Sequence, residues 1–366
     1  MKPRTKRILN LLLIVGTLGV VLIIGLRDNN LPDTIRYLTG IRMHCTLLCL
    51  VCWLLYIFCD AFSIWLFLRR RDIHIPLGYS YFASVIGAFY CNVTPGATGG
   101  QPMQIYYLHK RGAPTGLASS SLIGHFFCFQ LMLIIISSIL WATHTQFVAR
   151  FVGDWMWVMV AFFVYNLFVC GILIAVCFYE PAVHLLLRTA IKLGAKLRLV
   201  KNPEETLKKW TETGRAFHTS LVEMISNPKE LLVQLLIAAA QIVSLMTIVW
   251  LIYVGMSRSG ATYQQIFTLN ILEYITAANT PLPGASGMHE ATFTRFFSAF
   301  FEDRTFATLL LWRFFTFYIT LIVGAITVVV NGLLSGKSLH EVAELQDEVA
   351  VMERKETRDT METSEE

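Results

Sequence analysis

Two short glycine-rich motifs have residue types and spacing that could bind an anion. Pro-Gly-Ala-Thr-Gly occupies positions 95–99 and Pro-Gly-Ala-Ser-Gly occupies positions 283–287, each within strongly apolar sequence. Proline and glycine break helices, so each motif is expected to end one helix and begin another. A new helix presents unpaired backbone N–H groups at the positive end of its dipole, which favours phosphate. The motifs therefore predict a phosphate site formed by two helix N-termini.

Polar side chains beside the motifs complete the predicted site. His289 and Glu290 follow the second motif, and Arg313 lies in the last apolar stretch. Arg313 could pair with Glu290, meet a lipid phosphate or extend to the membrane surface. Glu290 and His289 could bind a cationic headgroup or carry a coupling proton, or Glu290 could only stabilise a helix start. The predicted phosphate-binding residues are Thr94, Pro95, Gly96, Thr98, Gly99, Gly100, Gln101, Pro283, Gly284, Ser286, Gly287, His289, Glu290 and Arg313.

Other reactive residue types in apolar sequence are interpreted as structural. Asp60, His125 and Glu273 are each expected to make a hydrogen bond inside a helix bundle rather than to take part in transport. Cys49 and Cys52 form a C-x-x-C pair, but no second cysteine or histidine pair completes a metal site. Cysteine often packs as a small apolar residue. We predict no catalytic residue, no metal site and no cofactor.

The elements that carry these residues are predicted to be membrane helices. The 366-residue chain is 55% hydrophobic and 15% charged, and its mean hydropathy is +0.57. These values are typical of a polytopic membrane protein. A helix needs about 20 apolar residues to cross a hydrocarbon core. The stretches that reach this length are Ile8 to Leu26, Met43 to Leu68, Leu117 to Trp141, Trp155 to Phe178, Leu231 to Gly255 and Phe306 to Leu334.

The first of these stretches follows a cluster of basic residues and could be a secretory signal peptide. Its length, and the lack of an A-x-A cleavage site after it, favour a retained signal anchor.

The two motifs lie in further apolar stretches, residues 77–112 and 262–301, that are interrupted by proline and glycine. Each stretch is predicted to form a helical hairpin that enters and leaves on one side, whether re-entrant or crossing fully twice. Loops at the membrane surface are the alternative. The predicted fold class is an all-α polytopic membrane protein with about six full transmembrane helices and two inverted, broken hairpins.

The distribution of basic residues predicts the orientation. One arrangement puts 18 Lys and Arg residues in the loops of one side and six in the loops of the other. The positive-inside rule then places both termini in the cytoplasm. The first hairpin enters from the cytoplasmic side and the second from the outer side. Such inverted pairs are typical of transporters that alternate access around a central site.

A membrane domain is predicted over residues 1–336. It includes a linker at 180–230, with nine basic and six acidic residues, that is read as cytoplasmic amphipathic helices or as a solvated connection. Residues 337–366 form a tail with ten acidic and four basic residues. This tail is expected to be cytoplasmic and disordered.

The motif sequences resemble the flippase-like membrane family that includes the transmembrane region of lysylphosphatidylglycerol synthase. The resemblance covers roughly residues 8–336 and rests on these features: Ile86-Gly87, the TPGATGGQP run at 94–102, Ile105-Tyr106-Tyr107-Leu108-x-x-x-Gly112, Pro283-Gly284-x-x-Gly287-x-x-Glu290, Arg313, Tyr318 and Gly324. Relatives often carry an acidic residue after the paired glycines and a basic one a few positions on, where this chain has Gln101 and Gln104. The full synthase has an additional soluble aminoacyltransferase domain, which we do not expect in this chain.

The resemblance and the motifs together predict a lipid translocator or lipid-binding transporter in the bacterial inner membrane. Its substrate would be an anionic or aminoacylated phospholipid, or a polyisoprenyl-phosphate lipid. One alternative is a phosphatidylglycerol lysyltransferase or its membrane subunit, which would use lysyl-tRNA and contribute to cationic peptide resistance. A small-solute transporter is the other. The expected partners are membrane phospholipid and a separate aminoacyltransferase or other lipid-synthesis protein, with no direct contact to nucleic acid.

Overall fold

A computed structural model describes residues 31–178 and 218–334, and within these ranges every regular element is a helix. The predicted span at Ile8 to Leu26, the acidic tail and most of the 180–230 linker lie outside the described residues. The end of the linker, residues 218–226, is helical. The helices are α2 (Leu31–Thr39), α3 (Met43–Arg69), α4 (Leu77–Val93), α5 (Gly100–Lys110), α6 (Thr115–Thr143), α7 (Thr145–Val152), α8 (Met156–Phe178), α11 (Pro228–Gly255), α12 (Tyr263–Ala277), α13 (Met288–Phe301), α14 (Thr305–Arg313) and α15 (Ile319–Leu334).

Five segments of the described chain are long and apolar enough to cross a membrane. They are Met43–Arg69, Thr115–Thr143, Thr145–Ile172, Pro228–Gly255 and Pro283–Asn331. The first, second and fourth are α3, α6 and α11, and the third joins α7 to α8 through the short turn η2 (Gly153–Trp155). The predicted spans of the described chain therefore have helical counterparts.

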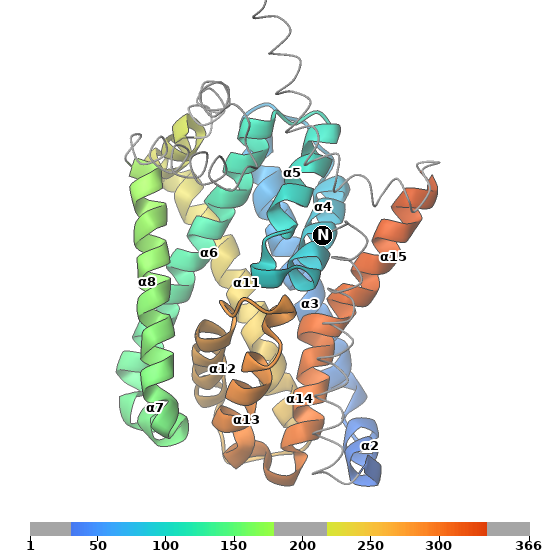
Figure 1. The fold of residues 1–366 in the computed structure, drawn as a ribbon, viewed down its shortest axis with the longest axis vertical. Helices are drawn as coiled ribbons and strands as arrows, with labels where there is room; N and C mark the ends of the chain where they lie inside the picture. Colours follow the sequence, from blue (N-terminus) through green and yellow to red (C-terminus); the bar gives the residue numbers. More distant parts are fainter. Residues whose placement is uncertain (1–30, 179–217, 335–366) are drawn as a thin grey trace, which may run out of the picture.

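Helices α3 and α11 pack along each other through the middle of the bundle (Figure 1). Their contact contains polar as well as apolar side chains: the Ser63 hydroxyl donates to Gln234 Oε1, and the Gln234 amide donates to the Ser63 carbonyl at 3.2 Å. At one end of this pair, Arg71 forms an ion pair of 2.9 Å with the buried Glu230. Buried polar groups with partners fix the register of two apolar helices.

The two predicted hairpins are present and enter the bundle from opposite ends (Figure 1). The first consists of α4 and α5, joined by the turn η1 (Pro95–Ala97), and the second of α12 and α13, joined by η3 (Pro283–Ala285). The turns η1 and η3 lie against each other, and η3 also contacts α4. Two segments far apart in sequence therefore meet at their tips in the middle of the bundle.

The last predicted span, Phe306 to Leu334, differs from a single regular helix. A π-helical turn, η5 (Phe314–Tyr318), separates α14 from α15 and starts directly after Arg313. A π-turn inserts an extra residue into the helix and redirects the side chains that follow. Here it accompanies close packing of Phe317 against Gly284, where an added Cβ would lie 2.0 Å from the ring.

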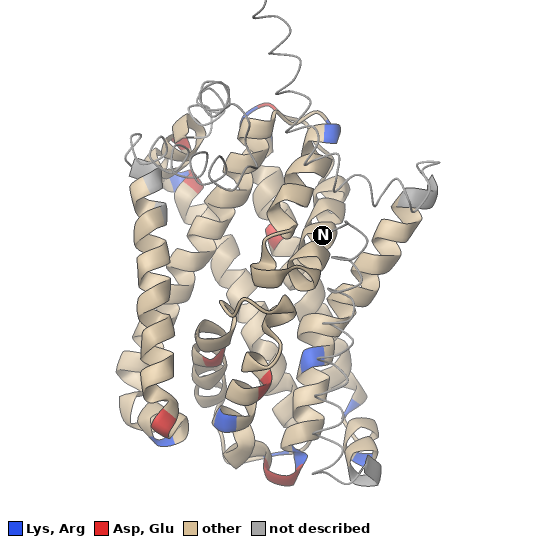
Figure 2. Cartoon of the chain, in the orientation of Figure 1, with Lys and Arg blue, Asp and Glu red and all other residues tan. Residues whose placement is uncertain are grey.

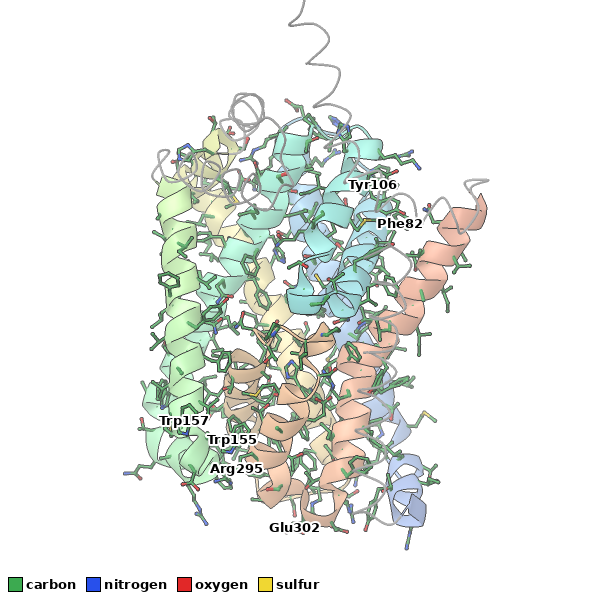
Figure 3. The ribbon with its side chains drawn as sticks, in the orientation of Figure 1. Phe82, Tyr106, Trp155, Trp157, Arg295 and Glu302 are labelled. Carbon is green, nitrogen blue, oxygen red and sulfur yellow. The ribbon has the colours of Figure 1, made fainter. Side chains whose placement is uncertain are left out.

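Charged residues gather at the two ends of the bundle and are sparse in its middle (Figure 2). Aromatic side chains lie toward both ends, with Phe82 and Tyr106 near one and Trp155 and Trp157 near the other (Figure 3). Large apolar side chains are exposed along α3, α8 and α15. An apolar belt between two charged ends, with aromatic residues at its margins, is the surface of a protein that crosses a membrane.

Candidate functional site

The two motifs have the same backbone conformation as far as their alanine and differ after it. Gly96 has φ 64° and ψ 21°, and Gly284 has φ 58° and ψ 22°. The alanine that follows is also left-handed in both copies, with φ 56° at Ala97 and φ 48° at Ala285. The residue before each motif proline is extended, as proline requires of its predecessor. The repeated sequence therefore starts the same turn twice, but Thr98 and Gly99 are helical whereas Ser286 is extended and Gly287 has φ 90°.

The first motif is mostly exposed, and its hydrogen bonds are internal. Pro95, Gly96 and Thr98 are exposed. The Thr94 hydroxyl donates to the Tyr90 carbonyl at 2.6 Å and accepts the Gly99 N–H at 2.9 Å. Helix α5 begins just after, with no acidic residue in its first turn and no side-chain cap. No carboxylate of α5 itself therefore neutralises the positive end of this helix dipole.

The second motif is held by side chains from the rest of the chain. Arg313 is 4% exposed, and it donates to the Gly284 carbonyl at 3.1 Å and to the Ser286 hydroxyl at 3.0 Å. Its Nε lies 2.7 Å from Glu290 Oε1, and the other Glu290 oxygen accepts the Gly287 N–H. Arg313 therefore pairs with Glu290, which was one of its three predicted alternatives. Because the side chain is buried, the alternative that it extends to the membrane surface is wrong.

A first carboxylate and histidine pair lies inside the second hairpin. Glu273 is fully buried on α12, and its Oε1 lies 2.8 Å from His289 Nδ1 and accepts the Thr292 hydroxyl at 2.7 Å. His289 packs edge-on against the Trp312 ring, with ring centroids 5.4 Å apart. These contacts join α12, α13 and α14 and include the hydrogen bond inside the bundle that was predicted for Glu273.

A second carboxylate and histidine pair lies beside the first hairpin. On α3, Asp60 Oδ2 accepts the Gln104 side-chain amide at 3.0 Å, which ties α5 to α3. Asp60 Oδ1 lies 3.4 Å from His125 Nε2 on α6. The same nitrogen lies 2.8 Å from Gln241 Oε1 on α11. Four helices thus contribute to one polar cluster in an apolar bundle.

The remaining predicted site residues divide between the two hairpins. Gly99 and Gln101 are half-buried and Gly100 is buried at the start of α5, against Cys91 of α4. Pro283 is buried as the first residue of η3, while Gly287 is exposed with φ 90°. The contact of η1 with η3 brings the two groups of residues together. Whether they bind phosphate stays a prediction.

Sequence reasoning missed Gln104 and Gln241 as members of a polar cluster. In the sequence, Gln104 stands out only as a departure from the family pattern. The available signal was a glutamine within each of two apolar helices, since a long amide in that setting needs a partner.

The helical bundle with an apolar belt and two oppositely directed, broken hairpins defines a polytopic membrane protein. Its sequence matches the model of the lysylphosphatidylglycerol synthase TM region over residues 7–324. The chain therefore belongs to the lysylphosphatidylglycerol synthase TM region family. A comparison with curated proteins finds no match.

Proposed function

We propose that this protein translocates a phospholipid across the membrane, with the lipid phosphate bound at the first motif. The observation that carries the proposal is the difference in electrostatic compensation between the two tips. Glu290 neutralises the start of α13, whereas α5 has no acid in its first turn and follows an exposed loop. Phosphate is the anion that such a helix start favours.

We infer that both hairpins are re-entrant. Their four helices have 17, 11, 15 and 14 residues, which corresponds to lengths between about 16 and 26 Å. The hydrocarbon core is about 30 Å thick. A helix of this length reaches the middle of the membrane and turns back. The broken backbone of the second tip then lies inside protein, and that of the exposed first tip would have to line a cavity, the two settings in which it is tolerated.

The arrangement of charge supports a cytoplasmic origin for the first hairpin. The exposed Arg69 and Arg70 precede it, beside Arg71, which is paired with Glu230, and the exposed Lys110 and Arg111 follow it. Basic residues at a cytoplasmic surface attract anionic lipid. We propose that an anionic or aminoacylated headgroup enters from this side toward the tip of the first hairpin, while its acyl chains stay in the bilayer.

The test is exchange of fluorescent phosphatidylglycerol and lysylphosphatidylglycerol between leaflets of liposomes that contain the purified protein. Thr98→Asp places a carboxylate on the exposed tip, and Thr98→Asn has a similar shape without the charge. We expect the wild type to accelerate exchange. The rate should be about tenfold lower in Thr98→Asp, because the new carboxylate repels phosphate, and the decrease should be smaller in Thr98→Asn. Equal loss in both variants would contradict phosphate binding at this tip.

A second candidate function follows from the family to which the chain belongs. As the membrane subunit of a phosphatidylglycerol lysyltransferase, the protein would serve a separate aminoacyltransferase. The same liposomes separate the two candidates. Unaccelerated exchange of both lipids, with formation of lysylphosphatidylglycerol once a soluble aminoacyltransferase and lysyl-tRNA are added, would favour the subunit.

A further inference from the structure

The cluster around Asp60 and His125 has no part in the proposed phosphate site, although it lies beside the first hairpin. We propose that Asp60 and His125 form a proton-binding site that controls the first hairpin and couples lipid movement to a proton gradient. This inference rests on the proposed function, because lipid movement is the process that the proton would drive.

The geometry supports exchange of a proton at Asp60. The Asp60 side chain is 22% exposed, whereas that of His125 is 7% exposed. An ionisable group in the middle of a membrane protein is costly, so one that is partly open to its surroundings needs a reason. Among the described residues, the only ion pair of Asp60 is with His125, and that pair depends on the protonation of the imidazole.

The imidazole of His125 has one nitrogen engaged and the other free. Its Nε2 faces two acceptor oxygens, Asp60 Oδ1 and Gln241 Oε1, so this nitrogen carries the hydrogen. Nδ1 is buried and has no hydrogen-bond partner in the described part of the chain. A histidine beside a carboxylate is a common basis of pH switches in proteins.

The titratable neighbours of Asp60 come from two helices. Tyr56 and Cys59 lie on α3 itself, and Cys91 faces Asp60 from α4. Helices α5 and α11 contribute the neutral amides of Gln104 and Gln241 to the cluster. Asp60 and His125 are therefore the only Asp and His in this group, and together they form the proposed proton site.

Gln104 connects the proton site to the first hairpin. Its side chain donates to Asp60 and packs against Gly87 of α4, where an added Cβ would lie 2.3 Å from Gln104 Cδ. A hydrogen bond to a carboxylate is roughly twice as strong as one to a neutral group. A proton taken from water onto Asp60 weakens the link between α3 and α5, and its return to water on the other side restores the link.

The Glu273 and His289 pair contains the same residue types without this access. Glu273 is fully buried and holds two hydrogen bonds to its own hairpin partner, α13. It supplies an internal comparison, because Glu273 is closed to its surroundings whereas the Asp60 side chain is partly open.

The first experiment measures lipid exchange and proton flux together, in liposomes that contain a trapped pH dye. We expect a pH gradient to change the wild-type exchange rate at least about tenfold and lipid exchange to move protons. Asp60→Asn should abolish both effects, and His125→Gln should reduce them. The control is His144→Gln, at the residue that directly follows α6, and this variant should keep both effects. A lipid exchange rate that is the same with and without the pH gradient would overturn the inference, and so would proton flux that persists in Asp60→Asn. Neither result would contradict lipid translocation.

The second experiment needs no transport. Spin labels at Pro102→Cys on α5 and Leu54→Cys on α3, both exposed positions, report the separation of the two helices in a background without other reactive cysteines. We expect the distance distribution to differ between pH 5 and pH 8 in the wild type and to be the same at both pH values in Asp60→Asn. A pH-dependent change without lipid exchange would reject the proposed function only, and no change in the wild type would reject the proton switch.

Discussion

The tips of the two hairpins begin with the same backbone turn, at Gly96-Ala97 and Gly284-Ala285, and have different chemical surroundings. At the second tip, Arg313 at the end of α14 donates to the loop, and Glu290 neutralises the start of α13. At the first tip, the hydroxyl of Thr94 accepts the hydrogen bond from the Gly99 N–H, and the loop is exposed. The comparison teaches that a repeated motif can be anchored in one copy and left available for a ligand in the other.

The difference arises from what packs beside each tip. The π-turn η5 carries Phe317 against Gly284, so that the second motif is enclosed. A Cβ added at Gly96 would meet only Thr98, at 3.8 Å. The first hairpin is instead linked to the bundle through Gln104 and Asp60, further along α5. We therefore regard the second tip as a fixed support and the first as the functional one.

The largest expected effect comes from breaking the anchor of the second tip. Arg313→Met removes a buried charge and leaves the Glu290 carboxylate without its partner, which is expected to cost about 3 to 5 kcal/mol of stability. Thermal unfolding in detergent measures the loss. Arg150→Met, at an exposed arginine, is the control and should change the unfolding temperature little.

The double variant Arg313→Met with Glu290→Gln sharpens this prediction. With neither charge present, no unpaired charge is buried, so we expect the double variant to recover part of the loss. A double variant that is less stable than either single variant would contradict the role of the pair as mutual compensation.

An intermediate effect is expected from the same substitution in the two copies of the motif. Both Gly96 and Gly284 have positive φ, so alanine should cost about 1 kcal/mol at each for backbone strain. Gly284→Ala also drives a methyl group into Phe317, which should add about 1 to 3 kcal/mol. Unfolding of the two variants in parallel tests the comparison, and equal losses would mean that the enclosure of the second tip contributes nothing.

The smallest effect is expected from hydroxyl groups. Thr292→Val removes a donor to the buried carboxylate of Glu273 and should cost about 1 to 2 kcal/mol. Thr98→Val removes only an exposed hydrogen bond to the Pro95 carbonyl and should change stability by less than about 0.5 kcal/mol. The difference between the two unfolding temperatures is the measurement, and a larger loss at Thr98 would reverse our assignment of support and functional tip.

Much of the fold could be predicted because membrane helices follow from length and composition alone. The apolar runs that became α3, α6, α8 and α11 are unambiguous, and the prolines and glycines marked both breaks. The π-turn after Arg313 left no such signal, because Phe314 to Tyr318 reads as ordinary apolar helix. Its extra residue fits the packing against Gly284, which depends on a segment about 30 residues away in the chain.

The candidate site could be predicted only in part, for the same reason. The motif residues, Asp60, His125 and Glu273 were all visible as unusual residue types in apolar sequence. Their pairing was not, because a hydrogen bond such as that between Asp60 and Gln104 joins positions on different helices.

The sequence by itself determined that the chain is a helical membrane protein, where its helices break, and that the break is repeated. Hydrophobic length and the backbone restrictions of proline and glycine are local properties, and they act at each position without reference to the rest of the chain. Only the tertiary structure decided which tip is neutralised and which is exposed. That outcome depends on Arg313 and Glu290 meeting across two helices, because the compensation of a charge is a property of its neighbours in space.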